Sequence, residues 1–144
     1  MAPKLFLIRG LPGSGKSTFA QTLSESFTYS GCMTWRFEAD MFFVDPVTEK
    51  YNFNPKKLGD AHRWCRELTE KQLEYGDNVI VSNTFTTKSE LEPYFKLAKK
   101  YGAKLTVITM NGNYGSIHNV PEAQIERMRN RFEHDISDLY ELVK

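Results

Sequence analysis

A glycine-rich loop near the amino terminus constrains this chain more than any other feature. Residues 10–18 read GLPGSGKST and come shortly after the apolar run LFLI. The spacing G-x-x-x-x-G-K-[ST] is completed by Gly10, Gly15, Lys16 and Ser17. Glycines allow successive backbone N–H groups to turn inward around phosphate oxygens. A helix that begins at Lys16 directs its positive end towards the same anion. The loop therefore predicts a site for a nucleoside triphosphate.

The polar side chains of this loop have expected roles. Lys16 can reach the β- and γ-phosphates, and the Ser17 hydroxyl can bind Mg²⁺. We therefore expect ATP and Mg²⁺ as cofactors, with Ser17 as the metal ligand. The residues expected to contact the nucleotide are Gly10, Pro12, Gly13, Ser14, Gly15, Lys16, Ser17 and Thr18. The alternative is a plain glycine-rich turn, which the flanking strand-like and helix-like segments disfavour.

Strand-like and helix-like segments alternate along the chain. Strands are predicted over residues 4–9, 33–39, 78–83 and 104–110, and helices over 16–29, 55–75, 88–100 and from Pro121 to the carboxyl terminus. This alternation predicts an α/β fold in which a parallel sheet of about four strands is sandwiched by helices. In such folds ligands bind at the carboxyl ends of the strands. Candidate site residues are therefore sought there.

Asp40 is expected at the end of the second strand. A carboxylate at that edge can accept the proton of an attacking hydroxyl, as the catalytic base does in phosphoryl transfer. The alternative is a helix cap or a simple turn residue.

The third strand ends in Ser82 and Asn83, which are both neutral. Many P-loop ATPases place an aspartate at this position to hold magnesium through water. Asn83 could instead orient a magnesium-bound water or a γ-phosphate oxygen. Without the acidic residue, the sequence favours a small kinase over an ATP-hydrolysing motor.

Three arginines lie within five residues of the last predicted helix. We expect at least one of Arg127, Arg129 and Arg131 to face the triphosphate, because phosphoryl transfer needs positive charge beyond Lys16. The alternative is a solvated face paired with Glu126 and Glu133. The apolar face that is expected to pack on the core comprises Ile125, Met128, Phe132, Ile136 and Leu139.

Residues of the second helix and of the loop before it are candidates for the acceptor side. His62 could contact an acceptor phosphate, or it could pack with Trp64 in the core, while Tyr51 and Phe53 could form an aromatic wall or only anchor their loop. The neighbouring Arg63 and Arg66 are expected at the surface, and His118 either belongs to a lid or stabilises a turn.

Composition limits the class of protein. The chain has 144 residues, which predicts one domain, 1–144, and its net charge of +1 gives no global attraction for nucleic acid. Its two cysteines have no metal-binding spacing and are expected as free thiols. The apolar run LFLI is too short for a signal peptide or a membrane span, so a cytoplasmic protein without membrane contact is expected. The oligomeric state is not predicted.

Together, the segments RGLPGSGKST, EAD, YNFNP, LGDAHRWC, NVIVSNTFTT and HNVPEAQIERMRNRFE resemble the phage-type polynucleotide 5′-hydroxyl kinases and related P-loop kinases, often labelled AAA-family ATPases. The resemblance spans residues 4–133. It implies a P-loop kinase-type sheet, transfer of the ATP γ-phosphate to the 5′-hydroxyl of a DNA or RNA end, and Asp40 as the base. For a phage-encoded protein it implies the host cytoplasm.

The sequence departs from that family at Ser82 and Asn83, which stand at an often acidic position, and at two further places. Phe42 and Phe43 stand where the family carries an arginine that holds the 3′ phosphate of the acceptor. The usual lid arginines are replaced by NYGSI, so Arg127, Arg129 or Arg131 would have to substitute for them. The alternatives are therefore a kinase of a nucleoside, nucleotide, other small metabolite or hydroxylated DNA base, and a non-catalytic regulatory protein that binds nucleotide.

Overall fold

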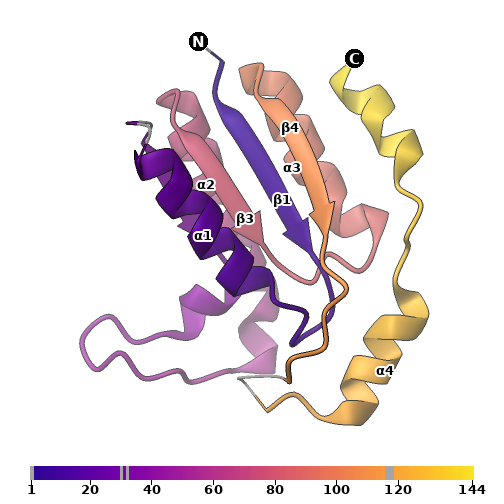
Figure 1. Cartoon of the computed structure of the whole chain (residues 1–144). Coiled ribbons are helices and arrows are strands. Elements are labelled where there is room, and N and C mark those ends of the chain that lie inside the picture. Colours follow the sequence, from indigo (N-terminus) through magenta and orange to yellow (C-terminus); the bar gives the residue numbers. More distant parts are fainter. Residues whose placement is uncertain (1, 30, 32, 116–118) are drawn as a thin grey trace.

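The computed structural model describes residues 2–29, 31, 33–115 and 119–144, which form a three-layer α/β structure (Figure 1). The elements in chain order are β1 (Lys4–Arg9), α1 (Lys16–Tyr29), β2 (Thr34–Phe37), α2 (Leu58–Glu74), β3 (Asn78–Ser82), α3 (Lys88–Tyr101), β4 (Lys104–Thr109) and α4 (Glu122–Arg131). Short 3-10 helices cover Ala39–Phe43, Pro55–Lys57 and Ser137–Val143.

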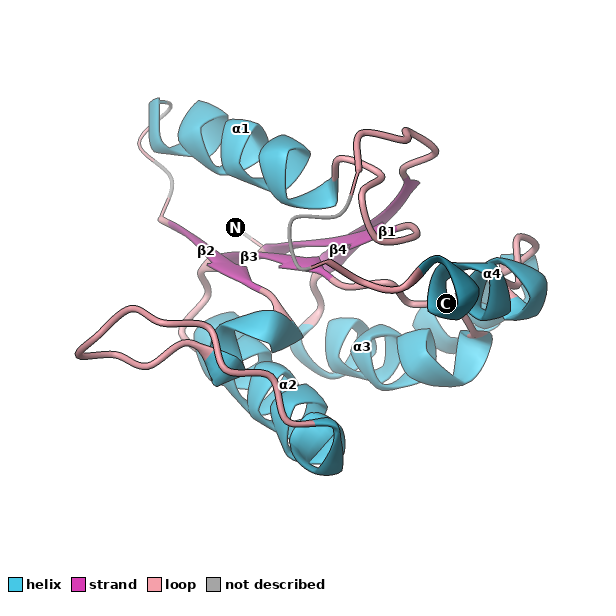
Figure 2. Cartoon of the chain, turned by 90° about the horizontal axis from the view of Figure 1, so that it is seen from below, coloured by secondary structure: helices cyan, strands magenta, loops and turns pink. Residues whose placement is uncertain are grey.

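The sheet has the strand order β2-β3-β1-β4, and all its pairs are parallel. Figure 2 shows α1 on one face of the sheet, α2 and α3 on the other, and α4 to one side. The predicted four-stranded parallel sheet between helices is therefore confirmed. Among the described residues, no helix combines the length and the apolar character needed to cross a bilayer.

The central strands are apolar because helices cover them on both sides. Every residue of β3 is buried, and β1 buries Leu5, Leu7 and Ile8. Ile8 packs with Ala20 of α1 on one face. Leu5 and Leu7 pack in the larger cluster that α2 and α3 supply on the other face. The two covered faces hold the carboxyl ends of β1 and β3 next to each other.

Two element boundaries differ from the sequence prediction. The second strand ends at Phe37 rather than at Asp40, because the chain turns into the 3-10 helix Ala39–Phe43. The second helix begins as a short 3-10 turn, capped by the Asn54 side chain, before α2 proper. Both changes lie at the edge of the sheet where the candidate residues gather.

The prediction of one continuous last helix is wrong. Helix α4 ends at Arg131, and Phe132 adopts an extended conformation with φ −66° and ψ 117°. The backbone N–H of Glu133 then donates to the carbonyl of Thr86 at 2.7 Å instead of continuing the helix. Ile136 and Leu139 do pack on the core as predicted. Helix α4 itself buries no residue, so its expected apolar face does not form one continuous stripe.

The break is fixed by a buried arginine at the end of β1. Arg9 is fully buried, and its Nε and Nη2 donate to the carbonyl of Phe85 at 3.0 and 2.7 Å. Its guanidinium lies 4.1 Å from the centre of the Phe132 ring. A cation–π contact is stronger away from water. Phe132 therefore covers a charge that has few other partners and is drawn out of the helix to do so.

Replacing Phe132 by leucine should lower the free energy of unfolding by about 1–2 kcal/mol, because most apolar volume stays while the aromatic face over Arg9 is lost. Urea denaturation measures this change. The control is His134→Ala, since His134 is exposed and its ring packs on that of Phe132 at 4.7 Å, so this change removes a neighbour of Phe132 but leaves the Phe132 ring over Arg9. It should change the free energy by less than about 0.5 kcal/mol. Equal losses for both variants would contradict the cation–π explanation.

Candidate active site

The loop between β1 and α1 has the backbone of a phosphate cradle. Gly13 has φ +80° and Gly15 has φ +95°, a region that glycine adopts without strain. A Cβ atom at Gly13 would lie 2.7 Å from the carbonyl oxygen of Gly115. Only glycine fits there, because residues 111–115 lie directly over the loop and Tyr114 donates its N–H to the Gly13 carbonyl at 2.8 Å.

The loop also holds polar atoms that lack protein partners. Ser14 is buried, and its hydroxyl has no hydrogen-bond partner in the described part of the chain. Buried polar groups normally have a partner, so such an orphan fits a ligand that supplies one. The phosphate oxygens expected at this loop are suitable acceptors.

Lys16 carries its charge into the loop. Its Nζ donates to the Leu11 carbonyl at 3.0 Å. Burial lowers the pKa of Lys16 to about 8, although the charges of Glu38 and Asp40 act in the opposite direction. A partly desolvated ammonium group that bonds to a neutral carbonyl is favourable for binding an anion.

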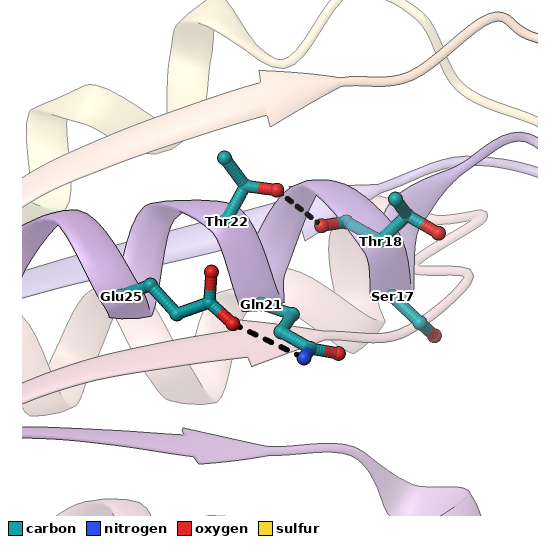
Figure 3. A pocket seen from close by; sticks show the side chains of 5 residues that line it. All are labelled: Ser17, Thr18, Gln21, Thr22 and Glu25. Atoms are coloured by element: carbon teal, nitrogen blue, oxygen red, sulfur yellow. Dashed lines mark hydrogen bonds between the residues drawn. The ribbon is translucent and has the colours of Figure 1, made fainter.

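Ser17 and Thr18 begin α1 and line a polar hollow along its outer face with Gln21, Thr22 and Glu25 (Figure 3). Glu25 is held by the Gln21 amide, and the Thr22 hydroxyl bonds the Thr18 carbonyl. The described residues contain no cluster of three or more histidine, cysteine or carboxylate side chains that could hold a metal by itself. A metal here would therefore need oxygens from the nucleotide, which matches the expected role of the Ser17 hydroxyl.

Asp40 lies in the first turn of the 3-10 helix Ala39–Phe43. Its Oδ1 accepts a hydrogen bond from the Tyr51 hydroxyl at 3.2 Å. Burial, and then the charge of Asp40, raise the pKa of Tyr51 to about 12, so this hydroxyl stays protonated and remains a donor. Tyr51, predicted to bind substrate, is thus within hydrogen-bonding distance of the predicted base. The loop that carries it, residues 44–54, extends away from the sheet in Figure 1.

Asn83 is placed differently from the sequence expectation. It is buried, and its Oδ1 accepts the backbone N–H of Ala39 at 2.8 Å. Its amide nitrogen faces the Cys65 sulfur at 3.8 Å. Both ends of the amide therefore bond to protein. In this arrangement Asn83 fixes the turn that precedes Asp40, and its predicted contact with substrate remains a prediction.

Sequence reasoning missed Glu38. Its carboxylate accepts the Ser82 hydroxyl at 2.8 Å and lies 3.6 Å from Arg36. Among the charges acting on Lys16, Glu38 has the largest effect. The carboxyl end of β3 has no acidic residue, and Glu38, directly after the adjacent strand β2, provides a carboxylate there. The signal in the sequence was the pair Glu38 and Asp40 in EAD, of which only the second was assigned a role.

The three arginines of α4 have separate surroundings. Arg127 donates to the Gln124 side chain, and Arg129 pairs with Glu126. Arg131 donates to the Thr86 hydroxyl at 3.1 Å. Arg129 also lines a pocket beside the phosphate loop, together with Gly10, Leu11, Ser14, Met110, Asn111, Gly112, Phe132 and His134. Arg129 is thus near the loop, whereas the predicted roles of Arg127 and Arg131 have no such proximity to support them.

His62 is half-buried on α2. Burial lowers its pKa, and the charges that act on it are those of Glu90, Arg66 and Asp40. The charge of the predicted base thus reaches His62, and the predicted contact of His62 with an acceptor stays a prediction. His118 lies outside the described residues.

Comparison with known proteins identifies the family. A family model described as an AAA domain matches residues 5–112, which include the phosphate loop, Asp40 and Asn83. The chain belongs to this AAA domain family. The resemblance to P-loop kinases is confirmed at this level, while the phage-type polynucleotide kinase subtype stays a prediction.

Two curated relatives of this AAA domain are much longer proteins. NEDD4-binding protein 2 of Homo sapiens is 32% identical over 146 residues, which is 92% of this chain and 8% of that protein. The 2′,3′-cyclic-nucleotide 3′-phosphodiesterase of Pongo abelii is 28% identical over 110 residues, which is 72% of this chain and 23% of that protein. The chain thus spans a small part of each.

Solved structures share the fold of this AAA domain. The Mycobacterium tuberculosis APS kinase CysC in complex with AMPPNP and APS has a TM-score of 0.62 at 17% identity and covers 97% of this chain and 72% of its own. A gluconokinase from Sinorhizobium meliloti 1021 has a TM-score of 0.58 at 17% identity, and the match covers 99% of this chain and 88% of the gluconokinase chain. The Pnkp1/Rnl/Hen1 complex has a TM-score of 0.59 at 20% identity, and the match covers 94% of this chain and 42% of that chain. These likenesses establish a P-loop kinase fold.

The lowered pKa of Lys16 gives a pH dependence for nucleotide binding. Above pH 8 the side chain loses its proton, so ATP affinity should fall as the pH rises, approaching about tenfold per pH unit well above the pKa. Calorimetric titration of ATP between pH 7 and 9.5 measures this. Lys16→Arg should bind more weakly but without this dependence, because arginine stays charged. The same slope in both proteins would exclude Lys16 as its source.

The buried bond from Ala39 to Asn83 should matter for stability. Asn83→Ala leaves the Ala39 N–H without its acceptor and should cost about 1–3 kcal/mol in the free energy of unfolding. The matched change is Ser82→Ala, which removes one donor to the half-buried Glu38 and should cost about 0.5–1.5 kcal/mol. Urea denaturation measures both. A smaller loss for Asn83→Ala than for Ser82→Ala would contradict this ranking.

Proposed function

We propose that this AAA domain is an ATP-dependent phosphotransferase in which Asp40 is the general base. The observation that carries the proposal is the position of Asp40 relative to two groups. It lies in the turn after β2 that Asn83, directly after β3, holds in place, and its charge acts on both Lys16 of the phosphate loop and His62 of α2. A hydroxyl bound beside Asp40 would therefore lie at the same edge of the parallel sheet as the donor phosphates.

The donor side follows from the loop. ATP would bind residues Gly10 to Thr18, with Lys16 on the β- and γ-phosphates and Ser17 as a ligand of Mg²⁺. Glu38 is half-buried, and its charge acts on Lys16 more than that of Asp40, so it could hold water molecules on the metal. Bound Mg²⁺ would neutralise charge on the phosphates.

The transfer step needs no covalent enzyme intermediate. The acceptor oxygen attacks the γ-phosphorus in line, its proton passes to Asp40, and the bond from the γ-phosphorus to the bridging oxygen breaks to release ADP. Lys16 stabilises the charge that develops on the phosphoryl oxygens. Arg129, which lines the pocket beside the loop, is the nearest of the α4 arginines to serve the donor nucleotide. All three arginines would act only after leaving their present partners, which are Gln124 for Arg127, Glu126 for Arg129 and Thr86 for Arg131.

The acceptor that we propose is the 5′-hydroxyl of a DNA or RNA end. Its support is the order of motifs along the chain, together with the aromatic side chains around Asp40. Phe43 packs edge-to-face with Tyr51 and Phe53, and Phe42 does so with Trp64. Tyr51 and Phe53 are exposed, and exposed rings can stack on bases.

A small hydroxyl compound is the second candidate acceptor. It is favoured by Phe42 and Phe43, which occupy the positions where the resembling kinases carry an acceptor arginine. The shared fold does not discriminate between the candidates, because the APS kinase and gluconokinase structures have it as well.

Asp40→Asn should reduce phosphoryl transfer by about 10²–10⁴-fold, the usual contribution of a general base, while ATP binding stays close to that of the unchanged protein. Transfer of γ-labelled phosphate to a 5′-hydroxyl oligonucleotide, a nucleoside and gluconate measures the acceptor and the base together. Lys16→Met should abolish transfer. Full activity of Asp40→Asn would reject Asp40 as the base, and absence of transfer to every acceptor would favour a regulatory nucleotide-binding role.

A further inference from the structure

The chain that follows β4 lies against the phosphate loop over residues 110–115, the post-β4 segment (Figure 1). The backbone N–H of Tyr114 donates to the carbonyl of Gly13 at 2.8 Å. A Cβ atom at Gly13 would lie only 2.7 Å from the carbonyl oxygen of Gly115. The two backbones therefore touch without a side chain between them.

Gly112 brings the post-β4 segment against a second peptide group of the loop. A Cβ atom at Gly112 would lie 2.8 Å from the carbonyl oxygen of Ser14, and it would also overlap the Tyr114 ring. Gly112 is not among the glycines with a positive φ. Glycine is thus needed at this position for space and not for its backbone conformation.

These contacts set the direction of a peptide group that could bind phosphate. In a planar trans peptide the C=O and the N–H point in opposite directions. The Ser14 carbonyl lies against Gly112, so the Gly15 N–H of the same peptide group points away from Gly112. Among the described residues nothing accepts the Gly15 N–H, whereas the Ser14 N–H bonds the Leu11 carbonyl at 3.1 Å. The Gly15 N–H is thus available to a phosphate oxygen.

The sheet anchors both segments. Strand β4 pairs with β1 along its whole length, and the Met110 N–H continues this register by donating to the Arg9 carbonyl at 2.7 Å. The phosphate loop begins directly after Arg9. The loop and the post-β4 segment therefore leave the sheet from neighbouring strands at the same edge.

The post-β4 segment brings no charge to the site. Its residues read MNGNYG, and the Tyr114 side chain is exposed. One edge of the Tyr114 ring lies beside Gly15, where a Cβ atom would be 3.2 Å from the ring. The contacts of this segment therefore act on the shape of the loop and not on its charge.

We infer that Gly112 and Tyr114 are positioning residues for the donor phosphates. Through Ser14 and Gly13 they hold the phosphate loop in a shape that can receive a phosphate before any nucleotide binds. A preformed loop loses less conformational freedom on binding and therefore binds more tightly. The inference rests on the proposed ATP site, and it makes the affinity of that site depend on a segment that need not touch the nucleotide.

Hydrogen exchange of the nucleotide-free protein tests the contact itself. The Tyr114 amide, which bonds Gly13, should be protected in the unchanged protein. Gly112→Ala should raise its exchange rate by about tenfold or more, because the added methyl group needs the space of the Ser14 carbonyl. Gly59→Ala is the matched control, since it adds the same methyl group at a glycine without a positive φ and with nothing within 4 Å. It should leave this rate unchanged.

Calorimetric titration with inorganic tripolyphosphate and with Mg·ATP measures the consequence for binding. Gly112→Ala should bind both about ten- to a hundredfold more weakly, whereas Gly59→Ala should stay within about twofold of the unchanged protein. In a transfer assay Gly112→Ala should raise KM for ATP more than it lowers kcat, because the loop is misplaced before ATP binds.

Substitutions at Tyr114 separate positioning from a general loss of folding. Tyr114→Pro removes the N–H that bonds Gly13 and should weaken both ligands as Gly112→Ala does. Tyr114→Phe keeps that N–H and the ring edge beside Gly15, so it should bind both within about twofold of the unchanged protein.

Two results overturn the inference: equal tripolyphosphate affinities of Gly112→Ala and Gly59→Ala, or a Tyr114 amide that exchanges freely in the unchanged protein. The kinase proposal is judged separately by labelled transfer. Transfer with an unaltered KM for ATP in Gly112→Ala would keep the kinase and reject the positioning role. Tripolyphosphate binding that depends on Gly112, without transfer to any acceptor, would keep the positioning role and reject the kinase. An unchanged protein that binds neither ligand would reject both.

Discussion

The buried hydrogen bond between the Asn83 side chain and the Ala39 backbone joins the two halves of the candidate site. Strand β3 lies between β1, which leads into the phosphate loop, and β2, which leads into the turn with Asp40. Its last polar residues bond the β2 side, with Ser82 on Glu38 and Asn83 on Ala39. The position of the phosphate loop relative to the Asp40 turn is therefore set by the parallel register of the strands and by these two contacts.

Most of the fold could be predicted because it depends on patterns that local sequence carries. The run NVIVS is apolar throughout, as a strand covered on both faces must be, and the loop GLPGSGKST specifies a backbone that other residues cannot adopt without strain. Lys16 begins the helix that follows this loop, as predicted. Gly102, which follows α3, has the left-handed conformation of a helix cap.

The parts that could not be predicted depend on contacts between distant segments. No glycine or proline adjoins Phe132, and the chain extends there because of two contacts with segments far away in the sequence, the Phe132 ring on Arg9 and the Glu133 N–H on the Thr86 carbonyl. Glu38 gains its position from Ser82 on another strand. Arg66 was expected at the surface but is half-buried, because helical periodicity does not say which other elements lie beside a given face of α2. Long-range electrostatics thus determines the features that pattern alone misses.

Residues 44–54 leave the sheet after the Asp40 turn and return to it at α2, and their single described bridge joins Val44 to Tyr51. Core packing restrains such a segment little, so its length and sequence can vary without disturbing the strands. Relatives could therefore exchange this loop and change the molecule that reaches Asp40, while the phosphate loop stays as it is. For protein engineering, the segment is a natural place to graft new acceptor specificity onto an unaltered donor site.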